Sequence, residues 1–224
     1  MSKVIAIVGF GPGVSIAVAE RFGAEGFSVA LIARSPASLA AGVAALKAQG
    51  IAAAAFVADA GDAAALRRAI AKVHAELGSI DVLHWNVYGG QGLGDLLTVD
   101  PTSVHVSFDL AVAGLLTAVQ AALPDLKAAK DGALLVTNGA YGEIGATFDA
   151  YALASKAEGV ALGNAAKAKL VGLLAARLKG EGVYVGEVTI GGTVGPAPMI
   201  PTQRVAETFW RLYADRDETR ARVG

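Results

Sequence analysis

Short apolar runs alternate with longer segments of helical periodicity along almost the whole chain. Six apolar runs have the length and side-chain types of buried strands, namely Val4–Val8, Val29–Ala33, Ala53–Val57, Val82–Trp85, Leu134–Thr137 and Val183–Ile190. Helical spacing fills the stretches between them, for example Ser15–Glu25, Pro36–Gln49 and Ser103–Leu123. This alternation predicts an α/β fold, a Rossmann-like doubly wound arrangement with a parallel sheet and helices on both faces.

Length and charge narrow the class of protein further. The chain has 224 residues and no shift of composition along it, so we expect a single domain over residues 1–224. Its 19 Lys and Arg balance 20 Asp and Glu. This balance gives no electrostatic reason to expect nucleic acid or a membrane surface as partner, and it leaves a small molecule as the expected one. We expect the charged tail Asp215–Arg222 to be solvated.

Cysteine, histidine and hydropathy exclude other classes. The chain has no Cys, which excludes a disulfide framework, and its three His show no ligand spacing, so no metal site is predicted. Although 54% of the residues are hydrophobic, no charge-free apolar run reaches the ~18 residues of a membrane span. Glycines interrupt the first apolar stretch, where a signal peptide would continue as a helix, and we therefore expect a cytoplasmic location.

A glycine-rich loop follows the first apolar run and reads Gly9-Phe10-Gly11-Pro12-Gly13-Val14-Ser15. Glycine lets the backbone turn tightly and approach a pyrophosphate, which then lies on the N–H groups of the next helix. The spacing is G-x-x-x-G-x-G, with a serine in place of the last glycine. We predict a dinucleotide site whose loop residues are Gly9, Gly11, Gly13, Val14 and Ser15.

This loop resembles the glycine motif of the short-chain dehydrogenase/reductase family, and the resemblance extends over nearly the whole chain. That family has an aspartate after its third strand and an Asn-Asn-Ala-Gly motif after its fourth. Asp59 and Asn86 stand at those places here. The resemblance implies that Asp59 lies near the adenine, that Asn86 belongs to the cofactor site, and that Val194 lies near the nicotinamide carboxamide.

The end of the second apolar run predicts which dinucleotide binds. NAD sites usually have an acidic residue about 20 residues beyond the glycines, where it binds the ribose 2′-hydroxyl. This chain has Arg34 there and no acid. Because a guanidinium pairs well with a phosphate, the sequence favours NADP(H) over NAD(H).

The catalytic residues of the family are only partly present. In the family a tyrosine transfers the proton, a lysine four residues later lowers the pKa of that tyrosine, and a serine thirteen residues earlier holds the carbonyl. Here Tyr151 is followed by Lys156 after five residues, Asn138 stands thirteen residues before Tyr151, and Ala111 replaces a helical asparagine. The resemblance implies Tyr151, Lys156 and Asn138 as the catalytic set, although a helix turns its fifth residue about 140° away. Thr137, the nearest hydroxyl, is expected on the opposite face of its strand.

A second alignment is equally open. Counting back from Gly182 by the interval usual in the family puts the lysine position at Asn164, close to Lys167. On that alignment, residues 142–159 hold an insertion over the active site, and the Tyr–Lys pair is missing.

Two functions follow from the resemblance. The first is an NADP(H)-dependent oxidoreductase that transfers hydride between nicotinamide and a small carbonyl or alcohol, with a substrate loop around residues 194–204. The alternative is a non-catalytic NADP(H)-binding pseudoenzyme or sensor, since several catalytic residues differ together. The family usually buries its two long helices against partner subunits, and the apolar surface of Leu110–Ala122 therefore predicts a homodimer or homotetramer.

Overall fold

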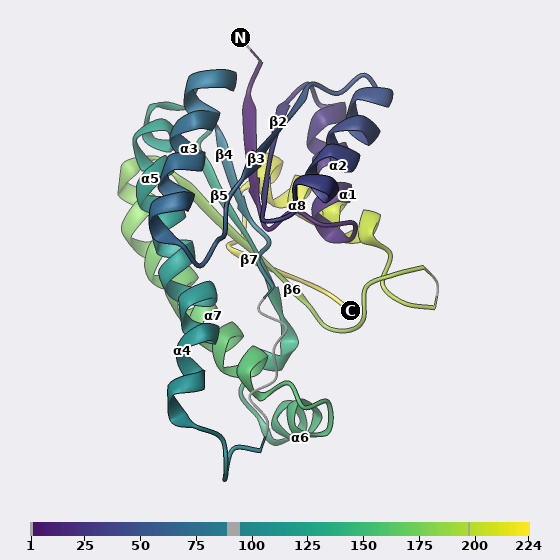
Figure 1. Ribbon diagram of the computed structural model, residues 1–224, viewed down its shortest axis with the longest axis vertical. Helices are drawn as coiled ribbons and strands as arrows, with labels where there is room; N and C mark the ends of the chain where they lie inside the picture. Colours follow the sequence, from purple (N-terminus) through teal and green to yellow (C-terminus); the bar gives the residue numbers. More distant parts are fainter. Residues whose placement is uncertain (1, 89–94, 197) are drawn as a thin grey trace.

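The computed structural model of the protein describes residues 2–88, 95–196 and 198–224. Its seven strands form one parallel sheet in the order β3-β2-β1-β4-β5-β6-β7 (Figure 1). The strands are β1 Val4–Val8, β2 Ser28–Ala33, β3 Ala53–Val57, β4 Val82–Trp85, β5 Ala133–Gly139, β6 Tyr184–Ile190 and β7 Arg220–Val223. The predicted α/β fold is confirmed.

Helices cover both faces of the sheet (Figure 1). One face carries α1 Val14–Ala24, α2 Pro36–Ala48 and α8 Thr202–Asp215. The other carries α3 Ala63–Leu77, α5 Leu115–Ala128 and α7 Glu158–Leu178. The shorter helices are η1 Pro101–Ser103, α4 Val104–Phe108, η2 Asp109–Gly114, η3 Ala140–Gly142, α6 Ala146–Ala154 and η4 Lys179–Glu181. Because every crossover between parallel strands passes over a face, both faces of the central strands are buried.

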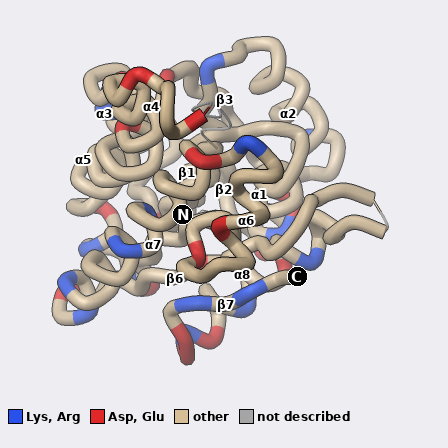
Figure 2. Tube along the Cα trace, turned by 90° about the horizontal axis from the view of Figure 1, so that it is seen from below, with Lys and Arg blue, Asp and Glu red and all other residues tan. Residues whose placement is uncertain are grey.

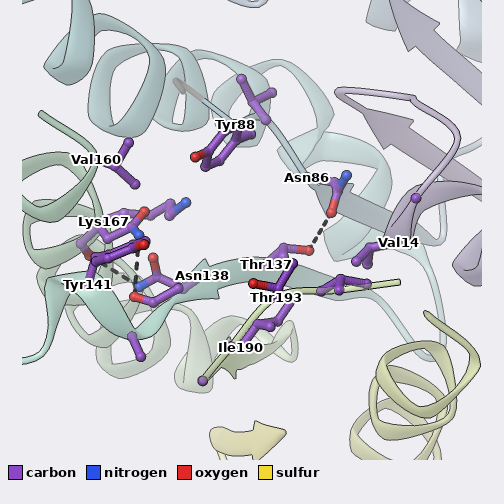
Figure 3. Close-up of a pocket in the computed structure, with 18 of the residues that line it drawn as sticks. Val14, Asn86, Tyr88, Thr137, Asn138, Tyr141, Val160, Lys167, Ile190 and Thr193 are labelled. Atoms are coloured by element: carbon purple, nitrogen blue, oxygen red, sulfur yellow. Dashed lines mark hydrogen bonds between the residues drawn. The ribbon is translucent and has the colours of Figure 1, made fainter. Parts of the chain in front are cut away.

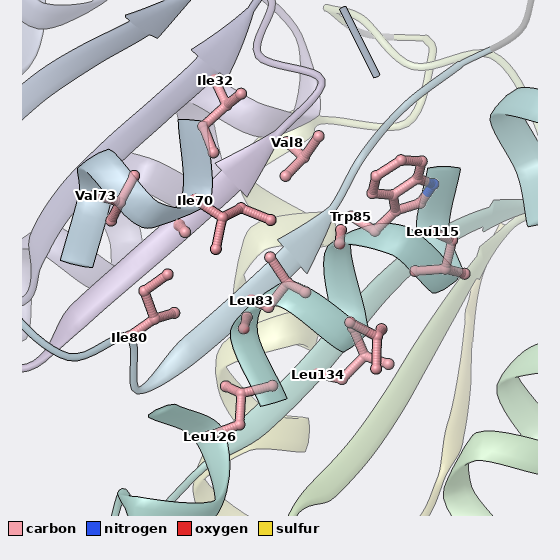
Figure 4. Packing of buried hydrophobic residues seen from close by; sticks show 14 of the residues in the cluster. Val8, Ile32, Ile70, Val73, Ile80, Leu83, Trp85, Leu115, Leu126 and Leu134 are labelled. Atoms are coloured by element: carbon pink, nitrogen blue, oxygen red, sulfur yellow. The ribbon is translucent and has the colours of Figure 1, made fainter. Parts of the chain in front are cut away.

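The core divides along the alternation of side chains in the strands. In β1, Ile5 and Ile7 pack with α1 and α8, whereas Ala6 and Val8 pack with α3 and α5. Figure 4 shows the second of these clusters, with Trp85 fully buried among strand and helix side chains. The Trp85 indole is therefore part of the hydrophobic core, which explains why a large aromatic residue can end β4.

The C-terminal segment forms a strand that was not predicted. The charged residues of Asp215–Arg222 are exposed or half-buried, as expected. Arg220–Val223 forms the edge strand β7 beside β6, and Val223 is only 2% exposed. The Arg220 Nε donates a hydrogen bond of 2.9 Å to Oε2 of the buried Glu187. A charged strand can join the sheet because its arginine finds a buried carboxylate partner. Charged residues of both signs gather at this edge in Figure 2.

Two helical segments, Pro101–Ala128 and Glu158–Glu181, are long and apolar enough by composition to cross a membrane. Both contribute side chains to the cluster against the sheet, among them Leu115, Leu126 and Val171. The expected single helix over Ser103–Leu123 is interrupted by a π-helical stretch, η2, at the place where the family carries its asparagine. The π-helical stretch is thus present without that side chain.

The strand order reverses between β1 and β4, since the chain crosses from the β3 side of the sheet to the β5 side there. Helix α1 follows β1 on one face of the sheet, and α5 lies beyond β4 on the other, which leaves a crevice at the carboxyl edge. Such a switch point is where open α/β sheets bind ligands. The fold therefore places the glycine loop and Asn86 at a prepared binding crevice.

Candidate active site

Two cavities meet at the carboxyl edge of β1 and β4. The first, of about 550 Å³, extends toward β5, β6 and α7, and the second, of about 530 Å³, extends toward β2 and β3. They share five lining residues, Gly11, Gly13, Asn86, Val87 and Tyr88. The shared wall makes one continuous cleft, long enough to take an extended ligand with the glycine loop at its middle.

The space around the glycine loop is closed at one glycine and open at two others. Gly9 has φ +86°, and a Cβ there would lie 2.7 Å from the backbone nitrogen of Val87. A Cβ on Gly11 or Gly13 would meet nothing within 4 Å. Gly9 is therefore needed by the fold, whereas Gly11 and Gly13 leave space that a ligand can fill.

Ser15 occupies the place of the last glycine without blocking the loop. Its buried Oγ accepts a hydrogen bond from the Gly11 N–H at 2.8 Å and donates to the Gly11 carbonyl at 2.9 Å. The hydroxyl thus closes the loop onto the first turn of α1. Gly13 caps that helix and has no side chain to bond the first N–H groups, which leaves them for an anion.

A chain of hydrogen bonds ties the loop to the sheet. The Asn86 Nδ2 donates to the Gly9 carbonyl at 3.2 Å, and the Thr137 Oγ1 donates to Asn86 Oδ1 at 2.8 Å. His84 Nε2 lies 3.0 Å from the same hydroxyl. Burial lowers the pKa of His84 to about 3, so the ring is neutral and its Nε2–H donates to Thr137. These bonds fix Asn86 at the centre of the cleft.

Arg34 and Asp59 lie together at the far end of the cleft. Both line the second cavity, with Ser35 and Ser38 beside Arg34. The Asp59 Oδ1 accepts a hydrogen bond of 2.9 Å from the Gly61 N–H, and the capping of α3 falls to Asp62. The exposed guanidinium and the two serines form a polar group suited to a phosphate.

The cleft fits a nicotinamide dinucleotide. The cradle at Gly11 and Gly13 is open, the first N–H groups of α1 have no side-chain partner at the cap, and Arg34 lines the far end of the cleft. Val194 and the glycine-loop residue Val14 both line the first cavity. Residues 194–196 and 198–204 are the described part of the expected substrate loop, and Val194 pairs with Ile200 in an isolated β-bridge.

At the nicotinamide end, the structure separates the expected tyrosine from its lysine. Tyr151, in α6, lines the first cavity and is 54% exposed, and its ring stacks on Tyr141 at 5.1 Å. The neighbouring phenol of Tyr141 raises the pKa of Tyr151. Helix α6 ends at Ala154, and Lys156 lies in the following turn with φ +51°, exposed and outside the cavity lining. The geometry therefore gives Lys156 no place beside Tyr151.

Asn138 lines the cavity but is already engaged. Its Nδ2 donates to the Asn164 carbonyl at 3.1 Å and to Glu187 Oε1 at 2.5 Å, while the buried Oδ1 has no partner among the described residues. A flipped amide would set its oxygen against the Glu187 carboxylate, which fixes the orientation. Both N–H bonds of Asn138 thus serve neighbouring elements in this structure, and the donation to a substrate carbonyl stays a prediction.

Helix α7 brings other residues to the position of the family pair. Val160, Asn164 and Lys167 all line the first cavity (Figure 3). Asn164 stands at the lysine position of the second alignment, and Val160, four residues earlier, at the tyrosine position. Asn164 donates to the Gly139 carbonyl at 3.3 Å, and Lys167 is 4% exposed. Burial lowers the pKa of Lys167 to about 8, against a smaller raising effect from Glu187.

Four hydroxyl-bearing residues of this cavity were not assigned a role from the sequence, namely Tyr88, Thr137, Tyr141 and Thr193. Thr137 was expected to face away, but the cavity wraps around the end of β5 and takes in both Thr137 and Asn138. The tyrosines carried no motif that could have marked them. Only the interval back from Gly182 pointed toward Lys167.

Comparisons with known proteins agree with this architecture. A relative from Arabidopsis thaliana, the 3-dehydrosphinganine reductase TSC10A, is 35% identical over 126 residues, which are 56% of this chain. The match spans only 37% of that relative's length. A metagenomic short-chain oxidoreductase solved in complex with NADP has 22% identity and a TM-score of 0.84, with 99% of this chain and 96% of that chain covered.

The L-sorbose reductase from Gluconobacter frateurii, solved with NADPH and L-sorbose, has 17% identity and a TM-score of 0.85. The superposition covers 99% of this chain and 95% of that one. At these identities the solved structures show the shared fold. The sequence pattern of the family described as short chain dehydrogenase matches residues 3–201, which is most of the chain. This protein is therefore a member of the short-chain dehydrogenase family.

Proposed function

We propose that the protein is an NADP(H)-dependent oxidoreductase that transfers hydride between nicotinamide and a small carbonyl or alcohol compound in the cytoplasm. One observation carries the proposal: a continuous cleft runs from Arg34, past the open cradle at Gly11 and Gly13, to a cavity of about 550 Å³ beyond the loop. A cleft with a phosphate site at one end and a mainly apolar cavity at the other suits a dinucleotide beside a small substrate.

Each part of the cleft has a role in the proposal. Gly9, Gly11, Gly13 and Ser15 shape the pyrophosphate site, and Asn86 holds the loop in place. Arg34 binds the 2′-phosphate and Asp59 borders the adenine. Val14 and Val194 flank the nicotinamide, and Tyr151 offers a hydroxyl at the mouth of the substrate cavity. When bound, the nicotinamide supplies or accepts the hydride, while these residues orient the reactants and exclude water.

The function is tested by NADPH consumption with a panel of aromatic and aliphatic aldehydes and ketones. We expect a fall of absorbance at 340 nm that depends on both protein and carbonyl compound, with an alcohol as product. Reduction of a C=C or C=N bond would appear in the product analysis instead. NADPH binding without turnover of any compound would favour the pseudoenzyme, an alternative supported by Val160 at the tyrosine position.

The substitution Arg34→Ala should weaken NADPH binding by about tenfold to a hundredfold, the value of charged hydrogen bonds to a phosphate, and leave NADH affinity nearly unchanged. Both affinities are measurable by titration of cofactor fluorescence. Arg68→Ala, at an exposed arginine of α3 outside the cleft, is the control. Equal affinity of the unaltered protein for NADPH and NADH would contradict the assignment of Arg34.

We also propose that the protein associates as a homodimer or homotetramer. Large apolar side chains are exposed on α4, at the start of the interrupted helix, and on α7: Val106, Leu162 and Leu173. Exposed apolar positions on neighbouring helices suit a second copy of the same surface.

A further inference from the structure

Lys167 is a buried cation without a partner. Its side chain extends from α7 to the wall of the first cavity, together with Asn138 and Tyr141 and across from Tyr88 (Figure 3). It is 4% exposed, and no hydrogen bond or ion pair among the described residues involves its ammonium group. An ammonium held in apolar surroundings without an acceptor is unfavourable, so its position indicates a ligand oxygen in the cavity.

The nearest carboxylate does not satisfy this ammonium. Glu187 is 1% exposed, and its two oxygens accept hydrogen bonds from Asn138 Nδ2 and Arg220 Nε. It lies near enough to favour the charged form of Lys167 but forms no ion pair with it within 4 Å. The Glu187 carboxylate therefore accepts hydrogen bonds from residues of β5 and β7. The N–H groups of Lys167 remain available to a ligand in the cavity.

Among the described residues that line this cavity, Lys167 is the only charged one. The ring of Tyr151 stacks on Tyr141 at 5.1 Å, and on the second alignment Val160 stands at the position of the family tyrosine. Asn138 has no free N–H bond. The side chain best equipped to meet a developing negative charge is therefore the lysine.

We propose that the Lys167 ammonium meets the reacting oxygen of the substrate and supplies both its positive charge and its proton. This inference rests on the proposed function. In the reduction, a hydride from the bound nicotinamide forms the new C–H bond, and the π electrons of the C=O bond move to oxygen. The oxygen takes a proton from Lys167 Nζ, which becomes a neutral amine and regains a proton from solvent. The products are the alcohol and the oxidised nicotinamide.

The proton affinity of Lys167 suits this role, because burial lowers its pKa to about 8 and a proton donor works best near the ambient pH. The elements packed around α7 carry few groups that could compete. Glu187 faces it from β6, and Arg220 stands behind that carboxylate on β7. The phenols of Tyr141 and Tyr151 share the cavity. Glu158, in the first turn of α7, is a second buried carboxylate, nine residues before Lys167. The other charged or titratable groups on the packed elements are exposed or half-buried, namely His105, Asp109, Asp149, Lys179, Glu181 and Tyr184.

The test uses benzoate, a planar carboxylate whose negative oxygens imitate the alkoxide formed at the carbonyl. Binding of benzoate is measured by calorimetry with and without saturating NADP⁺, for the unaltered protein, Lys167→Met and Lys169→Met. Lys169 is an exposed lysine of the same helix and serves as the matched control. NADP⁺ affinity and the melting temperature are measured for each protein, so that loss of the fold or of the cofactor is seen directly.

We expect benzoate to bind the NADP⁺ complex and to lose about tenfold or more in affinity in Lys167→Met, as for a hydrogen bond between charged groups. Lys169→Met should be unaffected, and NADP⁺ affinity should change by less than about threefold in all three proteins. For the unaltered protein, benzoate affinity should fall by about fivefold or more between pH 7 and pH 9.5, because Lys167 loses its proton while benzoate stays ionised.

Three results would overturn the proposal. Benzoate affinity could be equal in the unaltered protein and Lys167→Met, or benzoate could fail to bind a protein that binds NADP⁺. Lys167→Met could instead lose NADP⁺ affinity by tenfold or more, which would make Lys167 a cofactor ligand. Failure of NADP⁺ to bind the unaltered protein is a different outcome, because it removes the proposed function itself and with it this inference.

Discussion

The substitution Gly9→Ala should lower the free energy of unfolding by about 3 kcal/mol, and the melting temperature by about 10 °C. Two effects add at this residue. The backbone has φ +86°, where a side chain is strained, and the new Cβ would lie 2.7 Å from the Val87 nitrogen and 2.8 Å from the Asn86 carbonyl carbon. Both neighbours are backbone atoms of the loop after β4 and can yield only if that loop moves. Denaturant unfolding without cofactor measures the effect.

Gly11→Ala is the matched variant in the same loop. An added Cβ there meets nothing within 4 Å, and the backbone needs no left-handed conformation. We expect its stability without cofactor to stay within about 0.5 kcal/mol of the unaltered protein, while NADPH affinity falls by about tenfold or more, because the methyl group occupies the pyrophosphate cradle. Unchanged NADPH affinity in Gly11→Ala would show that no ligand approaches this glycine.

Lys167→Met should make the protein more stable at pH 7 by about 3 kcal/mol. Burial, partly opposed by the charge of Glu187, lowers the pKa of Lys167 from 10.5 to about 8 in the folded protein, and this net shift corresponds to about 3 kcal/mol against the charged form. If replacing a cavity lysine raises the stability, the lysine is retained for binding or catalysis and not for the fold.

The stability gain of Lys167→Met should depend on pH, in a direction set by the folded and unfolded pKa values of Lys167. Below pH 8 both the folded and the unfolded protein carry the proton, so the unaltered protein bears the full burial penalty. Between pH 8 and 10.5 only the unfolded protein holds it, so the stability contribution of Lys167 rises with pH. The advantage of Lys167→Met should therefore shrink between pH 7 and pH 9.5. Lys169→Met, tested by the same denaturant unfolding, should change neither the stability at pH 7 nor its pH dependence. If Lys167→Met gained no more stability than Lys169→Met, the burial penalty assigned to Lys167 would be contradicted.

The sheet and the glycine loop were predictable because their determinants are local. Buried parallel strands are continuous apolar runs, as Val4–Val8 and Ser28–Ala33 are, and the spacing of Gly9 and Gly13 is itself the signature of the loop. Strand β7 was missed for the opposite reason. Its sequence is charged, and it is stabilised by a carboxylate on Glu187 that lies 33 residues away along the chain.

The catalytic end of the cleft was harder to predict, because the positions of its residues depend on contacts between elements that are distant in the sequence. The five-residue step from Tyr151 to Lys156 left two alignments open, and the end of α6 at Ala154 separates the pair. From the sequence, Asn138 was expected to bind a substrate carbonyl. In the structure its amide nitrogen donates a hydrogen bond to Glu187 on the neighbouring strand. Lys167 looks like a surface lysine in sequence, since only the packing of α7 on η3 and β6 buries it.

Thermal unfolding with NADPH, with NADH and with neither tests the central claim most directly. A ligand at about 100 times its Kd adds about 2.7 kcal/mol to the folded state, a shift of several degrees for a chain of this size. The account predicts a clear rise in melting temperature with NADPH, a smaller one with NADH, and loss of the NADPH effect in Gly11→Ala. No rise with either cofactor would contradict the proposed oxidoreductase function and the assignment of the cleft.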